Sequence, residues 1–137
     1  MSDPTLTWQL LYTKPHAEEW AETNLRRQGF ATLLPRVAAG SGFAPLFPRY
    51  IFSGYYHGQS VGSLGGTSGV LYIVRCGDHP ARVPIEVIQE IRSRMNARNV
   101  VRVANAPSVD PLFAKTQRER VRALEGLVAA GFRVKVA

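Results

Sequence analysis

Three aromatic side chains and an arginine lie close together in the stretch Pro45-Leu46-Phe47-Pro48-Arg49-Tyr50-Ile51-Phe52. Their chemistry is that of binding. Side chains alternate between the two faces of a strand, so Tyr50 and Phe52 should point the same way. Aromatic and arginine side chains are enriched at the energetic centres of protein interfaces. Aromatic alternation also fills hydrophobic cores, and the residue types alone leave the docking surface and the core both open.

Few side chains could carry catalysis. Asp78 and His79 lie in one turn, but neither a paired base nor a nucleophile accompanies them. We expect Cys76 to be a small hydrophobe in an apolar strand. His16, His57 and His79 have no metal-ligand spacing and lack cysteine partners. The sequence therefore predicts no enzyme, no metal site and no cofactor.

Residues 57–69 are rich in glycine and serine, which is typical of a mobile loop with at most one helical turn. The spacing matches neither the dinucleotide fingerprint nor a Walker A motif, because no Lys-Ser or Lys-Thr pair follows the glycines. Binding of nucleotide phosphates by this loop is therefore weakly supported.

The composition is that of one globular domain with a small appendage: 137 residues, 45% hydrophobic and 20% charged. The net charge of +7 fits either a polyanionic partner or a solvated basic surface. The N-terminal residues do not have the character of a signal peptide, and no apolar run is long enough to span a membrane. A single cysteine rules out internal disulfides and favours a reducing cytoplasm.

The elements that must position these residues alternate between strands and helices. A helix over 15–28 has Pro15 in its first turn, a basic last turn and Gly29 as its stop. A second helix opens at Pro84, and one face carries Val87, Ile88, Ile91 and Met95. Strands are expected at 8–13, 30–37 and 49–56, with a continuous apolar and hence buried central strand at 70–75. A flexible connection is expected at 38–44 and a short closing strand at 100–103. This order predicts an α+β sandwich, a mostly antiparallel sheet of four to five strands flanked by helices.

The character of the chain changes near 105–111, which divides it into a domain over 1–106 and a tail over 107–137. The tail favours a helix over 112–129, because Val121, Leu124 and Val128 have rough helical spacing, and Gly131 would end it. The alternative is a strand and turn over 120–126 followed by a strand over 132–136.

The ordered motifs resemble the NusG N-terminal domain over residues 8–103. They are Trp8-x-Leu10-x-Tyr12-x-Lys14, Leu25-x-x-Gln28-Gly29-Phe30, Leu46-Phe47-Pro48-x-Tyr50-x-Phe52, Gly69-Val70, and Gly77-x-x-Pro80 with Val83-Pro84. The residues of the third motif are most similar to those of the specialised, RfaH-like members. The resemblance implies a cytoplasmic, non-enzymatic transcription elongation or antitermination factor, associated with the bacterial nucleoid through RNA polymerase.

The resemblance also implies partners and site residues. The clamp helices of the largest RNA polymerase subunit would dock on Tyr12, Phe47, Pro48, Arg49, Tyr50 and Phe52. A second set would face nucleic acid, including non-template DNA: Lys14, Trp20, Asn24, Arg27, Thr67 and Ser68. An RNA-binding or ribosome-associated module stays as the alternative, because basic charge with aromatic strands also suits base stacking.

The family normally continues into a KOW barrel, and residues 119–126 resemble its opening. We expect a truncated KOW-like tail, or a helix that covers the docking surface as in RfaH-like members. An uncovered apolar surface, or the tail itself, could also support a homodimer.

Overall fold

The computed structural model describes residues 6–103 and 111–132, and an antiparallel sheet lies at its centre. The sheet has five strands in the order β2-β5-β1-β6, and β9 pairs with β1 beside this path. Its strands are β1 (Thr7–Thr13), β2 (Ala31–Leu33), β5 (Tyr50–Tyr55), β6 (Val70–Ile73) and β9 (Arg82–Val83). The expected α+β class with a mostly antiparallel sheet is confirmed.

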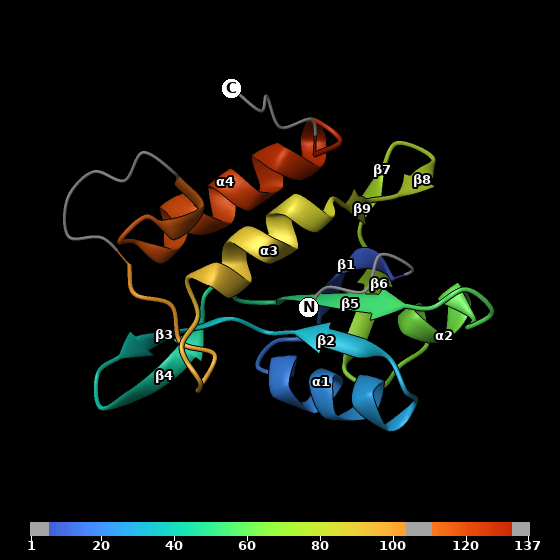
Figure 1. The fold of residues 1–137 in the computed structure, drawn as a ribbon, viewed down its shortest axis with the longest axis horizontal. Coiled ribbons are helices and arrows are strands. Elements are labelled where there is room, and N and C mark those ends of the chain that lie inside the picture. The colour runs from blue at the N-terminus through green and yellow to red at the C-terminus, as the bar shows by residue number, and fades with distance from the viewer. Residues whose placement is uncertain (1–5, 104–110, 133–137) are drawn as a thin grey trace.

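Helices cover both faces of the sheet (Figure 1). On one face, α1 (Glu18–Arg27) and α2 (Val61–Gly65) enclose a cluster of buried side chains that includes Leu11 and Ile51. On the other face, α3 (Ile85–Ser93) and α4 (Gln117–Ala129) close a larger cluster. Two hairpins extend from this body: β3 (Arg36–Ala39) with β4 (Gly42–Pro45), and β7 (Arg75–Cys76) with β8 (His79–Pro80).

The alternation along β1 and β5 decides which side chains reach which face. Leu10 pairs with Phe52 and Tyr12 with Tyr50 across the antiparallel ladder. Directly opposite residues share a face, and these belong to the larger cluster or pack against it. The expectation that Tyr50 and Phe52 point the same way is therefore confirmed.

Glycines end α1 and α4 in the same way. In α1, Gly29 has φ of 87°, and the amide of Phe30 donates to the carbonyl of Leu25. In α4, Gly131 has φ of 66°, and the amide of Phe132 donates to the carbonyl of Leu127. Both are Schellman caps, in which a residue with positive φ turns the chain back onto the last free carbonyls. Both glycine stops were expected from the sequence.

Three features differ from the expectations. Helix α1 begins at Glu18, because residues 15 and 16 form a turn and His16 has a positive φ of 59°. The strand expected at 30–37 is two strands, β2 and β3, interrupted at Pro35, which has no amide hydrogen to donate to a ladder. The flexible connection expected at 38–44 is instead the tip of the β3–β4 hairpin, where Gly40 takes φ of 57°.

Two strand assignments were wrong in kind. The apolar run at 70–75 is not a central strand, because β6 is the last member of its sheet path and both Leu71 and Tyr72 are exposed. Residues 100–103 form no strand; Val100 and Val101 make only isolated bridges. Helix α3 ends at Ser93, so Met95 lies beyond it.

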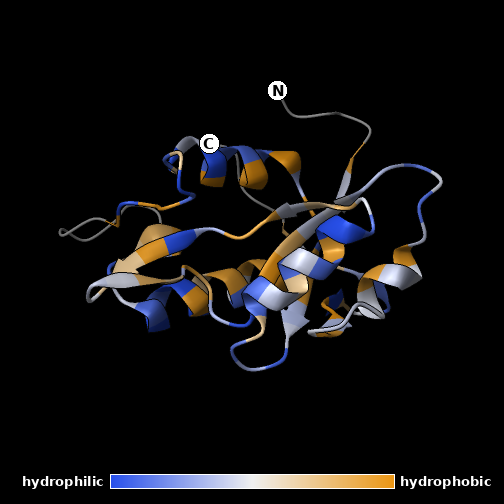
Figure 2. Cartoon of the chain, turned by 90° about the horizontal axis from the view of Figure 1, so that it is seen from below, coloured by the Kyte–Doolittle hydropathy of each residue, from blue (hydrophilic) through white to orange (hydrophobic). Residues whose placement is uncertain are grey.

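The tail is helical where the structure describes it. A 3-10 turn (Pro111–Phe113) leads to α4, which starts at Thr116, whose hydroxyl accepts from the amide of Glu119. The strand and turn considered for 120–126 are therefore wrong. The boundary at 106/107 and residues 133–136 of the alternative final strand lie outside the described residues. Figure 2 shows blue and orange alternating along the helix nearest the C label, the pattern of a helix with one apolar face.

Candidate functional site

Three tyrosines from three neighbouring strands form an aromatic cluster at one end of the sheet. The Tyr12 ring lies edge-on to Tyr50 with the centroids 5.1 Å apart, and it stacks with Tyr72 at 5.1 Å. Tyr72 is 53% exposed on the outer strand β6, whereas Tyr12 and Tyr50 are half-buried. The cluster therefore presents one exposed aromatic ring beside two half-buried rings.

A tight turn brings Pro48 and Arg49 to this cluster. The amide of Tyr50 donates to the carbonyl of Phe47 at 3.0 Å, and Arg49 has φ of 72°. Proline at the second position and positive φ at the third fit a type II turn, where glycine is the usual third residue. The turn places the Arg49 guanidinium 4.3 Å from the centre of the Tyr12 ring, a cation–π contact.

Glu18 holds Arg49 in this unusual conformation. Its side chain is buried, and Oε2 accepts the backbone amide of Arg49 at 2.8 Å. The guanidinium Nε donates to the carbonyl of Thr13 at 3.2 Å. Because both ends of Arg49 are fixed, the cation is presented in one direction before any partner arrives.

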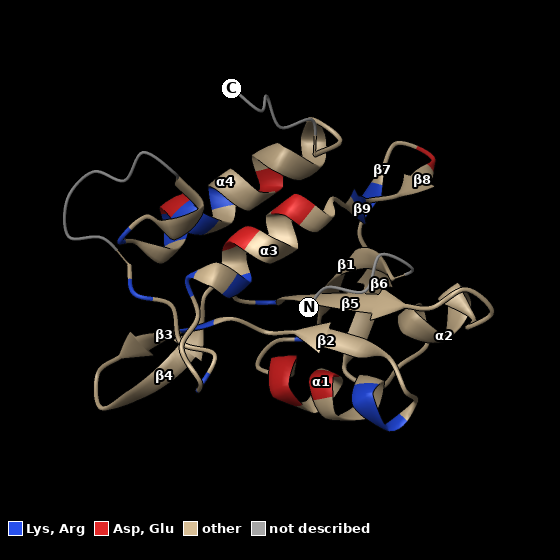
Figure 3. Ribbon diagram, in the orientation of Figure 1, with Lys and Arg blue, Asp and Glu red and all other residues tan. Residues whose placement is uncertain are grey.

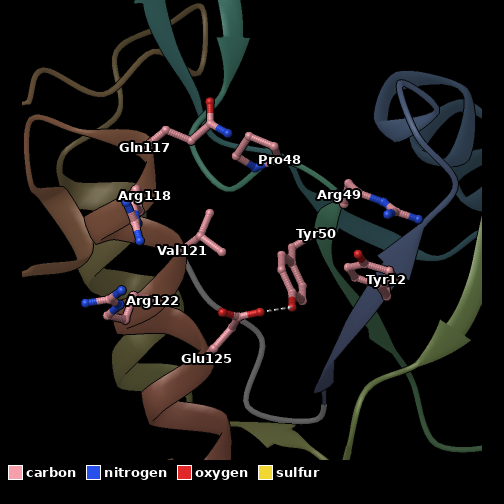
Figure 4. Close-up of a pocket in the computed structure, with 9 residues that line it drawn as sticks. All are labelled: Tyr12, Pro48, Arg49, Tyr50, Gln117, Arg118, Val121, Arg122 and Glu125. Atoms are coloured by element: carbon pink, nitrogen blue, oxygen red, sulfur yellow. Dashed lines mark hydrogen bonds between the residues drawn. The ribbon is translucent and has the colours of Figure 1, made fainter.

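Helix α4 faces the cluster across a hollow of about 620 Å³ (Figure 4). One wall comes from the sheet and its turn, and the other comes from α4. The lining residues are Tyr12, Pro48, Arg49, Tyr50, Gln117, Arg118, Val121, Arg122 and Glu125. The hydroxyl of Tyr50 bridges the walls by donating to Oε2 of Glu125 at 3.0 Å. Partial burial, and then this hydrogen bond to a carboxylate, raise the pKa of Tyr50 above its usual value.

Arg120 fastens α4 to the main body from inside. Its side chain is 4% exposed, and its Nε donates to the carbonyl of Leu46 at 3.0 Å. Nη1 donates to the carbonyls of Ala114 and Lys115 at 2.9 and 2.8 Å. Burial lowers the pKa of this guanidinium. The cation is therefore bonded to carbonyl oxygens of two segments: Leu46 in the main body, and Ala114 and Lys115 just before α4.

The structure separates the six expected docking residues into two groups. Tyr12, Pro48, Arg49 and Tyr50 line the hollow. Phe47 and Phe52 are instead core residues, 1% and 0% exposed, with their rings edge-on at 6.2 Å. An exposed ring at either position is a wrong expectation for this structure. Tyr50 and Phe52 lie on the same face, but Tyr50 is the first residue of β5, whereas Phe52 lies further inside the strand and is fully buried in the larger cluster.

The six expected nucleic-acid residues gather around α1 and the turn before β6. The Asn24 amide donates to the carbonyl of Ser68 at 3.1 Å, and the amide of Lys14 donates to the carbonyl of Gly69 at 2.9 Å. Thr67 is buried and accepts a bond from Gln28. A Cβ at Gly69 would lie 3.0 Å from the backbone nitrogen of Ala21, so turn and helix fit closely.

Side chains remain available to a partner on that surface. Trp20 is 54% exposed, and Lys14, Arg27 and Ser68 are exposed as well. Asn24 and Thr67 have structural hydrogen bonds instead, and Thr67 is too buried to touch a nucleic acid directly. The proposed role of that threonine is therefore restricted to shaping the turn.

Sequence reasoning missed four contributors to the docking site. Glu18 is only one residue of the helix expected over 15–28, and Tyr72 only one of the buried strand expected over 70–75. Glu125 and Arg120 come from the tail, and nothing local signals their contacts with Tyr50 and Leu46. The one available signal was the helical spacing of the tail. It predicts a helix with one apolar face, which would pack against another part of the protein.

Within residues 6–103 and 111–132, no group of three or more His, Cys, Asp or Glu side chains is placed to hold a metal ion. Over the same residues, no helix has both the length and the apolar character needed to cross a membrane.

The described residues form an α+β domain with a hollow lined by aromatic and cationic side chains. The family model described as "Transcription termination factor nusG" matches residues 6–92, which is more than half of the 137 residues. The chain belongs to the NusG family. Members of this family are non-enzymatic transcription factors that interact with RNA polymerase.

Proposed function

We propose that this protein is a transcription elongation or antitermination factor that docks on the clamp helices of the largest RNA polymerase subunit. The observation that carries the proposal is the hollow bordered by Tyr12, Pro48, Arg49 and Tyr50. Its aromatic rings and fixed guanidinium are the groups that dominate binding energy at protein interfaces. Family membership supplies the polymerase as the partner. The factor acts by binding, without catalysis, and works in the cytoplasm where the polymerase is.

The proposed interface has a buried support and an exposed contact layer. Phe47 and Phe52 support the layer from below, because both are core residues. Tyr12, Tyr50 and Arg49 meet the partner, and Tyr72 extends the surface along the sheet edge. A rigid support lets aromatic side chains bind with little loss of conformational entropy.

We further propose that the C-terminal helix α4 covers this interface until polymerase displaces it. Two contacts support the cover: Tyr50 with Glu125, and Arg120 with the carbonyl of Leu46. Val121 and Arg122 complete the wall opposite the tyrosines. A partner must therefore compete with α4 for the same aromatic surface.

The test is a titration of the full chain with the isolated clamp-helix hairpin of RNA polymerase. Tyr50→Ala removes an aromatic contact and should weaken binding at least tenfold, corresponding to about 1.4 kcal/mol or more at an interface centre. Glu125→Gln loosens the cover without touching the sheet, and it should strengthen binding severalfold. Glu86→Gln, an equal change of charge on the exposed part of α3, should leave the affinity unchanged.

The three variants separate the two halves of the proposal. If Tyr50→Ala binds the hairpin as well as the parent while remaining folded, the docking surface is not the one proposed. If Glu125→Gln and Glu86→Gln behave alike, α4 is not a competitor. Failure of every form to bind would move the RNA-binding alternative to first place.

A further inference from the structure

The chain that leaves α3 is strongly basic. Residues 92–102 contain four arginines and no acidic residue, and we name this segment the arginine loop. Figure 3 shows blue and no red along the connection that follows α3. The segment was assigned no role by the motifs that resemble the NusG family, which place nucleic acid at α1 and the turn before β6.

Three of these arginines are free of carboxylate partners among the described residues. Arg94 is paired with Glu90 at 2.9 Å and lies 4.0 Å from the centre of the Phe113 ring. Arg92, Arg98 and Arg102 are exposed and form no ion pair with any residue that the structure describes. Arg92 lies over the Trp8 ring at 5.1 Å, a contact that orients the guanidinium and leaves its charge unneutralised.

The arginine loop is held in one shape by its own polar groups. Oδ1 of Asn96 accepts the backbone amides of Arg98 and Val100 at 2.8 and 3.1 Å. Arg36 of β3 donates from its guanidinium to the carbonyl of Arg98 at 2.6 Å and from its amide to the carbonyl of Asn99 at 2.8 Å. These bonds fix the direction in which the Asn96 side chain points, because its oxygen is fully used.

A polar hollow of about 320 Å³ lies between the arginine loop and α1. Its lining is Glu22, Arg26, Thr32, Leu33, Leu34, Arg92, Met95, Asn96 and Asn99. The one carboxylate, Glu22, is occupied: Oε2 lies 3.5 Å from Arg26 and accepts from the Thr32 hydroxyl at 3.2 Å. The Arg92 guanidinium and the side-chain NH2 groups of Asn96 and Asn99 donate to no residue that the structure describes, so the hollow has spare donors. Its two arginines and one glutamate also give it an excess of positive charge.

We propose that this hollow binds a backbone phosphate of a single nucleic-acid strand. Guanidinium and amide donors on a fixed frame are the groups that hold phosphate oxygens and set the register of a strand. A strand fits better than a small anion, because a second hollow shares Met95 and Asn96 with this one. Arg94 and Arg102 line that second hollow and extend the positive charge. The spare donors come from the arginine loop, with Arg26 of α1 across the hollow. The residues expected from family resemblance are different ones, on α1 and in the turn before β6.

The inference extends the proposed function, since a factor on RNA polymerase works beside exposed nucleic-acid strands, but it does not depend on the clamp-helix contact. The experiment is a fluorescence-anisotropy titration of the full chain with a labelled single-stranded oligonucleotide of about 12 nucleotides, over a series of salt concentrations. Arg92→Gln and Asn99→Asp alter the hollow. Arg82→Gln removes an equally exposed charge from β9 and serves as the matched control.

Arg92→Gln should weaken oligonucleotide binding severalfold and reduce the slope of log affinity against log salt by about 0.7, the value for one phosphate contact on a single strand. Asn99→Asp, which introduces a carboxylate into the hollow, should weaken binding more. Arg82→Gln should change the affinity less than twofold. Equal losses for Arg92→Gln and Arg82→Gln would mean that only net charge matters, and would overturn the site.

Amide NMR spectra distinguish a strand from a free anion. The oligonucleotide should shift the side-chain amides of Asn96 and Asn99, and inorganic phosphate at the same phosphate concentration should not. Equal shifts from both would identify a small-anion site and overturn the nucleic-acid assignment. Arg92→Gln should bind the clamp helices as tightly as the parent does. If no form binds the clamp helices but the oligonucleotide results are as expected, the proposed function is wrong and the phosphate site is still supported.

Discussion

Tyr50 joins the sheet to the C-terminal helix through a single hydroxyl, and its ionisation breaks that contact. The neutral phenol donates to the carboxylate of Glu125, whereas a phenolate would face it as a second negative charge. Burial and this interaction raise the pKa of Tyr50 in the folded protein above the usual 10.0. The stability gained from the contact is therefore complete below pH 10 and is lost as the pH rises through the folded pKa.

Ultraviolet absorbance of the phenolate during an alkaline titration measures this directly. We expect one of the five tyrosines to ionise later than the others, and Tyr50→Phe to remove that late step. Glu125→Gln should move the step toward a lower pH without restoring the usual value, because burial remains. Tyr56→Phe, at an exposed position, should leave the late step in place. A late step that survives Tyr50→Phe would contradict the assignment.

At the scale of residues, sequence reasoning recovered what depends on local geometry. The alternation of β5 predicts that Tyr50 and Phe52 share a face, but not that one lies at the rim and the other under the helices. That difference depends on which part of β5 the rest of the chain covers, and this is set by packing between distant segments. The contact between Tyr50 and Glu125 spans 75 positions, and no local pattern encodes it.

Among the elements, α4 is attached to the rest of the fold in an unusual way. The buried cation that attaches it bonds to backbone carbonyls instead of a carboxylate. Arg120 donates to the carbonyls of Leu46, Ala114 and Lys115. Arg120→Met retains much of the apolar stem but leaves these oxygens without their donor. We expect a loss of about 2 kcal/mol in the free energy of unfolding, since unsatisfied buried acceptors cost about 1–3 kcal/mol.

Urea denaturation of the two proteins, followed by circular dichroism, gives this difference. Arg118→Met is the matched control, because Arg118 lies on the same helix and is exposed. It should change the unfolding free energy by less than about 0.5 kcal/mol, as surface substitutions usually do. An equal effect of both variants would show that the three carbonyls are satisfied by solvent when Arg120 is absent.

The helix ends were the most predictable parts of the elements, because Gly29 and Gly131 supply the positive φ that a Schellman cap requires. The β3–β4 hairpin was missed, because its small residues resemble a loop and its register comes from pairing across the turn. The sequence also did not predict that β6 lies at the edge of the sheet. An apolar run indicates a strand that is buried on both faces, whereas the side chains of Leu71 and Tyr72 are exposed.

Across the whole molecule, the C-terminal segment shares a core with the sheet. Leu112, Phe113, Leu124 and Phe132 belong to the same buried cluster as Trp8 and Phe52. Leu124→Ala should therefore lower the stability of the entire fold, by about 2–4 kcal/mol for a fully buried leucine. Urea unfolding monitored by tryptophan emission reports on the sheet through the buried Trp8, and on α1 through the exposed Trp20.

Leu127→Ala, three positions further along α4 and only half-buried, should cost less than half as much. If Leu124→Ala leaves the tryptophan transition unchanged, α4 leaves the body before the sheet unfolds, and the division into a domain over 1–106 and a tail over 107–137 describes two separable units. A homodimer through an uncovered apolar surface or through the tail likewise stays a prediction.

The turn at Arg49 has a practical consequence for engineering this protein. A non-glycine residue with φ of 72° costs about 1 kcal/mol relative to a relaxed backbone, and glycine would adopt the same turn without that strain. A library selected only for heat resistance would therefore enrich glycine at position 49 and discard the guanidinium over Tyr12. At this position the most thermostable variant and the best polymerase binder should be different molecules, so any screen here needs to score both properties together.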